Sequence, residues 1–387
     1  MMNYGLSDDT WGPEEYQAIN DVIESRQFTM GQKVKAYEEK FALKVGSRHA
    51  VMVNSGSSAN LIAIAALVLD GRLTKGDEVL VPAVSWSTTY SPLHQYGLTL
   101  KFIDVNIDTL NIDISEMERA ISPNTKAVFA VNILGNPNDY DRISLLCEKY
   151  GLLLIEDNCE ALGAIYNGKH TGTFGVIGTY STFYSHHICT MEGGVAVTDD
   201  DDLFHLMLSI RAHGWTRDIP SESNIYQKGE NKFYESFNFI TPGYNLRPLE
   251  MEAAIGIHQL DKLNTFIENR QNNARYFKSK IDNPNILLQT EVGSSSWFGF
   301  SIVLTNNLRG AREKIVQSLQ QAGIDVRPIV AGNFTRNSVI KYFDYSICGT
   351  LENADIIHEN GMFVGNHSII IDEKIDQLVK LLNNFYK

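Results

Sequence analysis

Two segments of the sequence place polar side chains where a predicted strand ends. The segment 54–59, with the sequence NSGSSA, follows the apolar run His49–Val53 and precedes an apolar helix. Backbone N–H groups at such a helix N-terminus can bind a phosphate, although a serine N-cap explains the same turn. The apolar run Leu152–Ile155 leads to Asp157, at the end of a strand where open α/β sheets bind ligands. This aspartate could keep a pyridine nitrogen protonated, or it could cap the next helix.

Two further features could complete a site for a flat, charged ring. Trp86, in PAVSWSTTY, can stack on such a ring, although a tryptophan more often belongs to the core. The segment Ser181–Gly194 reads STFYSHHICTMEGG and contains the adjacent histidines His186 and His187. An imidazole titrates near neutrality and can act as a general base. The two histidines are therefore candidate proton acceptors.

These segments need a parallel sheet to bring them together. Apolar, β-branched runs alternate with helix-length amphipathic segments, which is typical of a largely parallel, doubly wound α/β sheet covered by helices. The runs are His49–Val53, Glu78–Val81, Leu100–Ile103, Ala127–Val131 and Leu152–Ile155. Near the N-terminus, Pro13 fits the first turn of a helix and Gly46 fits a helix stop. We therefore expect a helical arm before the first strand.

The alternation weakens after about Gly256, which predicts a domain boundary there. A helical pattern runs from Ile257 to about Ile281, and the remainder indicates an α+β unit that ends in a helix. We expect residues 1–256 to form the N-terminal arm and the large domain, and residues 257–387 the small C-terminal domain. The polar segment Arg217–Asn231 predicts an exposed loop.

Composition excludes several classes of protein. The chain of 387 residues carries a net charge of −13, which gives no long-range attraction to a nucleic acid or an anionic membrane surface. It lacks both an uninterrupted apolar stretch of about twenty residues and a basic start followed by an apolar run. We therefore predict a cytoplasmic protein. The four cysteines are far apart, so we expect neither a disulfide framework nor a metal site.

The segment Ser181–Gly194 resembles the cofactor-lysine segment of the DegT/DnrJ/EryC1 sugar aminotransferases. In that family Ser-Phe-x-x-x-Lys is followed, six residues after the lysine, by Glu-Gly-Gly or Asp-Gly-Gly. Both spacings end on His186, so the lysine is absent. Other matches in register include SGSSAN, FIDVN, EDNCEALGA and PGYNLRPLEMEAAIG. The resemblance implies a fold-type I, aspartate aminotransferase-like enzyme with a mostly parallel, seven-stranded type of large-domain sheet.

The histidine changes the expected chemistry. An imidazole has no primary amine to join to the cofactor aldehyde, so pyridoxal or pyridoxamine 5'-phosphate would be held by noncovalent contacts. His186 could then take a proton from the cofactor methylene, which allows the C3 hydroxyl of a bound sugar to leave.

The dehydratase branch of the family is the most similar, and it implies a specific reaction. The expected substrate is a nucleotide-linked 4-keto-6-deoxyhexose of the GDP-mannose series, used in colitose and O-antigen biosynthesis. L-glutamate would restore the pyridoxamine form, and ammonia would be released.

The resemblance also assigns cofactor contacts residue by residue. They are Gly56, Ser57 and Ser181 on the phosphate, Trp86 on the ring face, Asp157 at the ring nitrogen and Glu160 beside the ring. Asn245 would reach the phosphate bound by another subunit, which implies a homodimer with shared sites.

Substrate contacts are implied in the same way. His213 and Arg247 would bind glutamate, and Arg217 and Arg327 the sugar nucleotide, since a guanidinium suits carboxylate and diphosphate. The neighbouring residues Arg26, Gln27, Phe28 and Thr29 would lie near the nucleotide.

Two alternatives remain from the sequence. One is an aminotransferase that recruits a lysine from elsewhere in the chain, and the other is a noncatalytic, pyridoxal phosphate-binding regulatory protein. A related sugar dehydrase that also lacks the lysine uses an iron–sulfur cluster held by grouped cysteines, which this chain does not provide.

Overall fold

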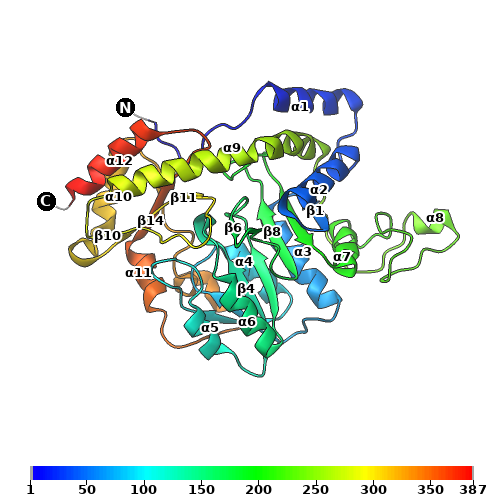
Figure 1. Cartoon of the computed structure of the whole chain (residues 1–387). Helices are drawn as coiled ribbons and strands as arrows, with labels where there is room; N and C mark the ends of the chain where they lie inside the picture. The colour runs from blue at the N-terminus through cyan, green and yellow to red at the C-terminus, as the bar shows by residue number, and fades with distance from the viewer. Residues whose placement is uncertain (1–2, 386–387) are drawn as a thin grey trace.

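A computed structural model describes residues 3–385 and contains a large mixed sheet (Figure 1). Its eight strands lie in the order β1 (His49–Val53), β9 (Gly194–Thr198), β8 (Ile177–Ser181), β5 (Leu153–Asp157), β4 (Thr125–Val131), β2 (Glu78–Pro82), β3 (Thr99–Ile103) and β13 (Tyr345–Ile347). Strand β9 is antiparallel to both of its neighbours, and all other adjacent pairs are parallel. The expected mostly parallel sheet is confirmed, with β13 as an eighth strand at the edge.

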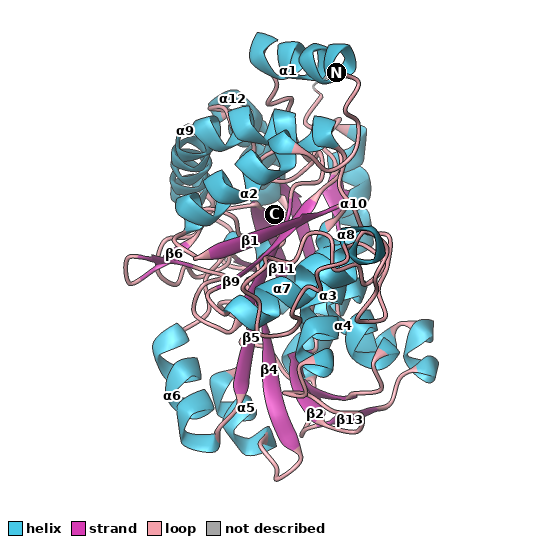
Figure 2. Ribbon diagram, turned by 90° about the vertical axis from the view of Figure 1, so that its right-hand side faces the viewer, coloured by secondary structure: helices cyan, strands magenta, loops and turns pink. Residues whose placement is uncertain are grey.

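Helices cover both faces of this sheet because alternate side chains of each strand point to opposite sides. Val51 and Val53 of β1 pack in a core with α3 and α7, whereas Met52 packs with α2 and α9. Figure 2 shows α5 and α6 on one side of β4 and β5, with α3 and α4 on the other. The helices are α2 (Gln32–Val45), α3 (Gly56–Leu69), α4 (Ser87–Gln95), α5 (Ile114–Ala120), α6 (Tyr140–Tyr150), α7 (Asp201–Arg211) and α9 (Glu250–Lys280).

The predicted helix boundaries hold at the N-terminal end of the chain. Pro13 begins α1 (Pro13–Ser25), and Gly46 ends α2 with a φ of 78°, a left-handed conformation that glycine adopts readily. The long helix α9 begins at Glu250 rather than near Ile257, because the carboxylate of Glu252 caps the N–H of Leu249 at 2.9 Å. The expected division at residue 256 therefore falls inside one continuous helix.

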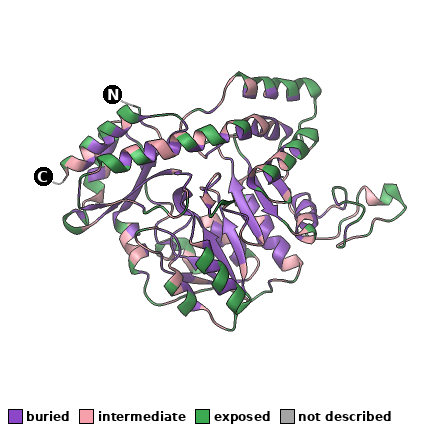
Figure 3. Ribbon diagram, viewed as in Figure 1, coloured by how far each residue is buried: buried purple, intermediate pink, exposed green. Residues whose placement is uncertain are grey.

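A second, smaller sheet lies beside the C-terminal half of α9. Its four antiparallel strands follow the order β10 (Ile286–Leu287), β11 (Gly299–Leu304), β14 (Gly361–Gly365) and β12 (Val326–Arg327). Helices α10 (Arg312–Gln321), α11 (Glu352–Asn360) and α12 (Asp372–Asn384) flank it. Phe300 and Ile302 of β11 share a core with Phe277 of α9 and Leu378 of α12. As Figure 3 shows, exposed residues lie on the outer helix faces and the sheets are buried.

Three further segments belong to neither of the two sheets. Residues 4–12 form an arm that contacts the small sheet, since the hydroxyl of Tyr4 donates to the carbonyl of Gly365 in β14 and Tyr4 bridges Ile324, two residues before β12. The strands β6 (Ile165–Tyr166) and β7 (Lys169–His170) form a short hairpin. The expected loop from Arg217 projects from the body and carries α8 (Lys232–Glu235) at the far right of Figure 1. In residues 3–385, no helix is long and apolar enough to cross a membrane.

Candidate active site

A cavity of about 750 Å³ lies at the carboxyl ends of the parallel strands. Its walls come from the turn before α3, from the ends of β5 and β8, and from the small sheet. It contains eight of the residues selected from the sequence, namely Gly56, Ser57, Trp86, Asp157, Glu160, Ser181, His186 and Arg327. The parallel sheet therefore brings together segments that are more than 100 residues apart in the chain.

The carboxylate of Asp157 is fixed by hydrogen bonds at both oxygens. Asn60 Nδ2 and Thr89 Oγ1 donate to Oδ2 at 2.9 and 2.8 Å, and the N–H of Cys159 donates to Oδ1 at 3.0 Å. Thr179 in turn donates to the amide oxygen of Asn60 at 2.6 Å. Asp157 is almost fully buried, so these donors compensate its burial and hold it in one orientation.

The turn before α3 forms a close-fitting cradle. Ser55 is the N-cap, because its hydroxyl accepts from the N–H of Ser58 at 3.1 Å, so the simple explanation of this turn is also correct. A Cβ on Gly56 would lie 2.6 Å from the Cβ of Ser181 and 2.9 Å from the sulfur of Cys159. Glycine is required for that approach, and it leaves the helix N-terminus open to the cavity.

These features fit pyridoxal phosphate. The N–H groups and hydroxyls at Gly56, Ser57 and Ser181 suit a phosphate, and the fixed carboxylate of Asp157 suits a protonated ring nitrogen. Trp86 lines the cavity with its side chain 56% exposed, so it is not a core residue and can cover a ring. No lysine of residues 3–385 lines this cavity.

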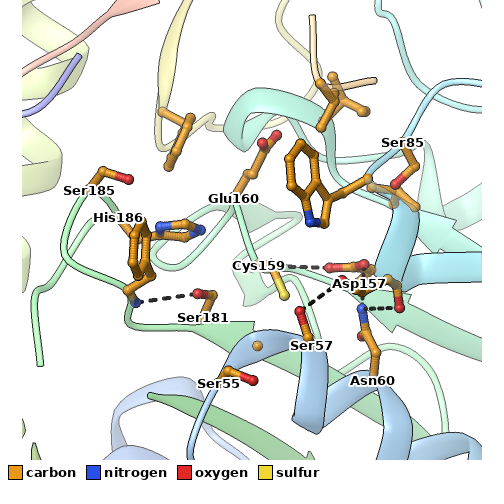
Figure 4. Close-up of a pocket in the computed structure, with 18 of the residues that line it drawn as sticks. Ser55, Ser57, Asn60, Ser85, Asp157, Cys159, Glu160, Ser181, Ser185 and His186 are labelled. Carbon is orange, nitrogen blue, oxygen red and sulfur yellow. Dashed lines mark hydrogen bonds between the residues drawn. The ribbon is translucent and has the colours of Figure 1, made fainter. Parts of the chain in front are cut away.

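His186 lies across the cavity from Asp157, with Glu160 between them (Figure 4). Its imidazole packs against the rings of Phe183 and Phe298, at centroid distances of 5.9 and 5.1 Å. Burial, and then the positive charge of Arg270, lower the pKa of His186 to about 3. The imidazole is therefore neutral near pH 7 and able to accept a proton.

His187 does not share this position. It is fully buried, and its Nε2 lies 3.1 Å from the carbonyl oxygen of Ser296. It is not among the residues that line the cavity. Of the two adjacent histidines, His186 alone can meet a bound ligand.

Glu160 and Cys159 complete the wall next to Asp157. The N–H of Leu134 donates to Glu160 at 2.9 Å, and burial together with the charge of Asp157 raises the pKa of Glu160 to about 7. Burial and the same charge raise the pKa of the Cys159 thiol. Glu160 can therefore hold or release a proton near neutrality, whereas Cys159 stays uncharged.

The other residues selected from the sequence lie outside this cavity. Arg217 and Arg247 place their guanidinium carbons 4.2 and 5.9 Å from the ring centroid of Trp215, and His213 meets the same ring edge-on at 5.2 Å. Asn245 accepts a hydrogen bond from Arg247 at 3.0 Å. We call these residues, with Trp215, the Trp215 cluster.

The segment 26–29 is exposed between α1 and α2 and lies beside the start of α9. Thr29 pairs with Leu249, and the N–H of Glu250 donates to the carbonyl of Phe28 at 3.1 Å. The segment therefore lies beside Leu249, which follows Arg247 by two residues. The nucleotide-binding residues expected from the sequence thus lie in three places: Arg327 in the cavity, Arg217 in the Trp215 cluster, and the segment 26–29 on the surface.

Several residues of the site were not anticipated. Asn60 and Thr89 fix Asp157, and Phe298 contacts His186 from the side of the small sheet. Asn60 has a signal in the sequence, because it follows Gly56 by four residues and so lies on the same face of the helix. Phe298 has no such signal, because its contact depends on how the two sheets pack.

Comparison with known proteins gives the same picture. The model of the DegT/DnrJ/EryC1/StrS aminotransferase family matches residues 9–383. This chain belongs to that family. The expected membership and the α/β fold of its pyridoxal phosphate enzymes are confirmed.

Relatives within this DegT/DnrJ/EryC1/StrS family are similar over their full length. A protein of Escherichia coli O55:H7 named GDP-4-keto-6-deoxy-D-mannose 3-dehydratase is 52% identical, over 99% of this chain and 100% of its own. A solved structure of the E. coli enzyme of that name with bound hydrated PLP has a TM-score of 0.97 at 52% identity, covering 99% of this chain and 100% of that one. Another, with a trapped PLP-glutamate geminal diamine, also has a TM-score of 0.97 at 52% identity, covering 98% and 100%.

Proposed function

We propose that this protein removes the C3 hydroxyl of GDP-4-keto-6-deoxy-D-mannose, with pyridoxal phosphate as cofactor and L-glutamate as cosubstrate. The observation that carries the proposal is a cavity built for this cofactor in which a neutral His186 stands where the family has its lysine. The 52% identity to dehydratases over essentially the whole chain supports the same substrate.

When bound, the pyridoxamine form supplies the amine that joins the sugar at C4 and a ring that accepts an electron pair. With the cofactor in this cavity, His186 would accept a proton from its methylene and could donate it to the departing C3 oxygen. Asp157 keeps the proton on the ring nitrogen. Because position 186 offers no primary amine, the chain cannot reclaim the cofactor covalently, and hydrolysis releases ammonia.

The overall reaction balances with glutamate as reductant. The sugar loses one oxygen at C3, and glutamate becomes 2-oxoglutarate and ammonia. For glutamate we assign His213 and Arg247, and for the sugar nucleotide Arg217, Arg327 and the segment 26–29. A guanidinium suits both the carboxylates and the diphosphate.

A homodimer is part of the proposal because the Trp215 cluster lies outside the cavity of its own chain. Asn245, Arg247 and His213 would enter the cavity of the partner subunit. The projecting segment adjoining the cluster exposes Phe233, Phe237 and Phe239, apolar surface that a second copy would cover. A cytoplasmic location likewise remains part of the proposal.

Product analysis tests the reaction. Purified protein is incubated with pyridoxal phosphate, glutamate and GDP-4-keto-6-deoxy-D-mannose, and the mass of the sugar nucleotide product is measured by mass spectrometry. We expect loss of one oxygen, with one ammonia and one 2-oxoglutarate per sugar. Omission of glutamate should prevent turnover, and an amino sugar as product would identify an aminotransferase instead.

Mixed dimers test the shared site. Variants His186→Asn and Arg247→Met should each be nearly inactive alone. If Arg247 serves the partner's cavity, a mixed dimer combines one doubly altered site with one intact site. Mixing after reversible dissociation should then restore about one quarter of the wild-type rate, the statistical value for random pairing of two-site dimers. No recovery would place both residues in one chain's site.

A further inference from the structure

The imidazole of His186 has no hydrogen-bonding partner that fixes its orientation. Its Nδ1 is buried without a partner among residues 3–385, and its ring contacts are with Phe183 and Phe298. A catalytic base is ordinarily oriented by a third group that hydrogen-bonds to it. The position of the imidazole therefore depends on its packing against Phe298 and on the backbone of the loop 182–193 that carries the residue.

This loop is closed at its base but has no strand or helix of its own. The N–H of Thr190 donates to the carbonyl of Thr182 at 2.9 Å, and the N–H of Tyr184 donates to that of Met191 at 3.0 Å. Met191 has a φ of 71°, which is strained for a residue with a side chain. The tip of the loop needs further contacts to hold one conformation.

Two side chains from outside the loop clamp Cys189, three residues after His186. Trp11 Nε1 donates to the carbonyl oxygen of Cys189 at 3.0 Å, and the N–H of Cys189 donates to Gln259 Oε1 at 3.1 Å. Gln259 Nε2 donates in turn to the carbonyl of Thr10 at 3.0 Å and to Glu15 at 2.7 Å. The N–H and the carbonyl of Cys189 are thus tied to α9 and to the N-terminal arm, respectively.

The arm that carries Trp11 is itself anchored. Tyr4 donates to the carbonyl of Gly365 at 2.7 Å, and Asp8 accepts from the N–H of Ser368 at 2.9 Å. The arm therefore connects the small sheet to the loop of the base. Because the arm is anchored in this way, the indole N–H of Trp11 is a fixed donor.

We propose that Trp11 is a positioning residue for His186, acting through its hydrogen bond to the carbonyl of Cys189. This inference rests on the proposed role of His186 as the base. An error of about 1 Å in the position of a catalytic group can lower a rate about a hundredfold, so one anchor at the loop tip has a measurable effect. Trp11 does not line the cavity and has no contact with the reacting atoms.

The test uses the glutamate half-reaction, which is followed by the cofactor absorbance and needs no sugar. Trp11→Phe removes the indole N–H and keeps an aromatic ring. We expect the limiting rate to fall about fivefold, the value of one neutral hydrogen bond, with half-saturation by glutamate within about twofold of wild type. The matched control is Tyr16→Ala, which removes the ring that meets Trp11 edge-on at 5.6 Å and leaves the donor in place. It should retain the wild-type rate.

Hydrogen exchange of the cofactor-loaded protein tests the structural half of the inference without any turnover. Amides in residues 184–192 should exchange several-fold faster in Trp11→Phe and unchanged in Tyr16→Ala. A wild-type limiting rate, unchanged exchange, or a defect confined to glutamate affinity would overturn the inference. If instead the clamp behaves as expected and the sugar is not dehydrated, the proposed function fails and the role of Trp11 stands.

Discussion

Asp157 and His186 face the same cavity, yet the protein holds them in opposite ways. Three donors fix the carboxylate of Asp157, from α3, α4 and the backbone after β5. The imidazole of His186 has aromatic neighbours, and its buried Nδ1 has no hydrogen-bonding partner within residues 3–385. Hydrogen bonds hold the first group in one orientation, and burial keeps the second group neutral.

The difference agrees with the roles proposed for the two groups. A carboxylate that holds a proton on a ring nitrogen must keep its charge throughout, so hydrogen bonds to it are favourable. A general base must be unprotonated before it can accept a proton, and burial together with the charge of Arg270 keeps the resting imidazole of His186 unprotonated. Four predictions test this contrast, in order of decreasing effect.

His186→Asn should have the largest effect. We expect both half-reactions to slow about 1000-fold, because a general base contributes 10²- to 10⁴-fold, while the cofactor still binds. Single-turnover absorbance changes with glutamate and with the sugar measure the two rates. His187→Asn is the control, and we expect it to affect stability more than rate. A normal rate in His186→Asn with an inactive His187→Asn would make His187 the base.

Asp157→Asn should slow catalysis about a hundredfold, since the amide cannot hold the ring nitrogen protonated as a carboxylate does. Cofactor affinity should change less than about tenfold, because the phosphate contacts remain. Equilibrium dialysis gives the affinity and single-turnover kinetics the rate. Wild-type turnover in this variant would remove Asp157 from its role.

His186→Lys should place a primary amine in the cavity, and this amine can bind the cofactor covalently. The lysine amine can form a C=N link to the cofactor aldehyde, and dehydration should fall about tenfold or more through this capture. Borohydride reduction followed by peptide mass analysis should locate the adduct at position 186. The wild-type protein, with no lysine lining the cavity in residues 3–385, should give no adduct there.

The pH dependence of stability should show the smallest effect. The folded protein lowers the pKa of His186 to about 3, whereas the unfolded chain takes up this proton near pH 6.5. Because the unfolded state binds more protons between these values, the group's contribution to stability falls as pH falls below 6.5. From pH 8 to pH 6, wild type should lose about 0.8 kcal/mol more free energy of unfolding than His186→Asn. Urea unfolding of both proteins measures the difference, and equal losses would mean that His186 is not held neutral.

Much of the cavity wall around Asp157 and Gly56 could be predicted from local sequence. The apolar run that ends at Asp157 and the small residues around Gly56 are signals of a strand end and of a helix N-terminus, and both are where predicted. Trp86 was ambiguous between core and cavity, since only its exposure in the folded chain separates the two. The start of α9 was misplaced, because its cap at Glu252 belongs to a segment without apolar periodicity.

The sequence by itself determined the family, the α/β class and the absence of lysine at position 186, because these depend on residue types at fixed spacings along the chain. The family spacing also selected His186 over His187, and tertiary structure alone decided what surrounds and holds each histidine. His186 and His187 are neighbours of the same type, and packing sends one to the Ser296 carbonyl and the other to the cavity beside Phe298. The hydrogen bond from Trp11 to Cys189 joins residues 178 positions apart. No sequence pattern predicts it, because a single hydrogen bond between distant segments produces no periodicity in either segment.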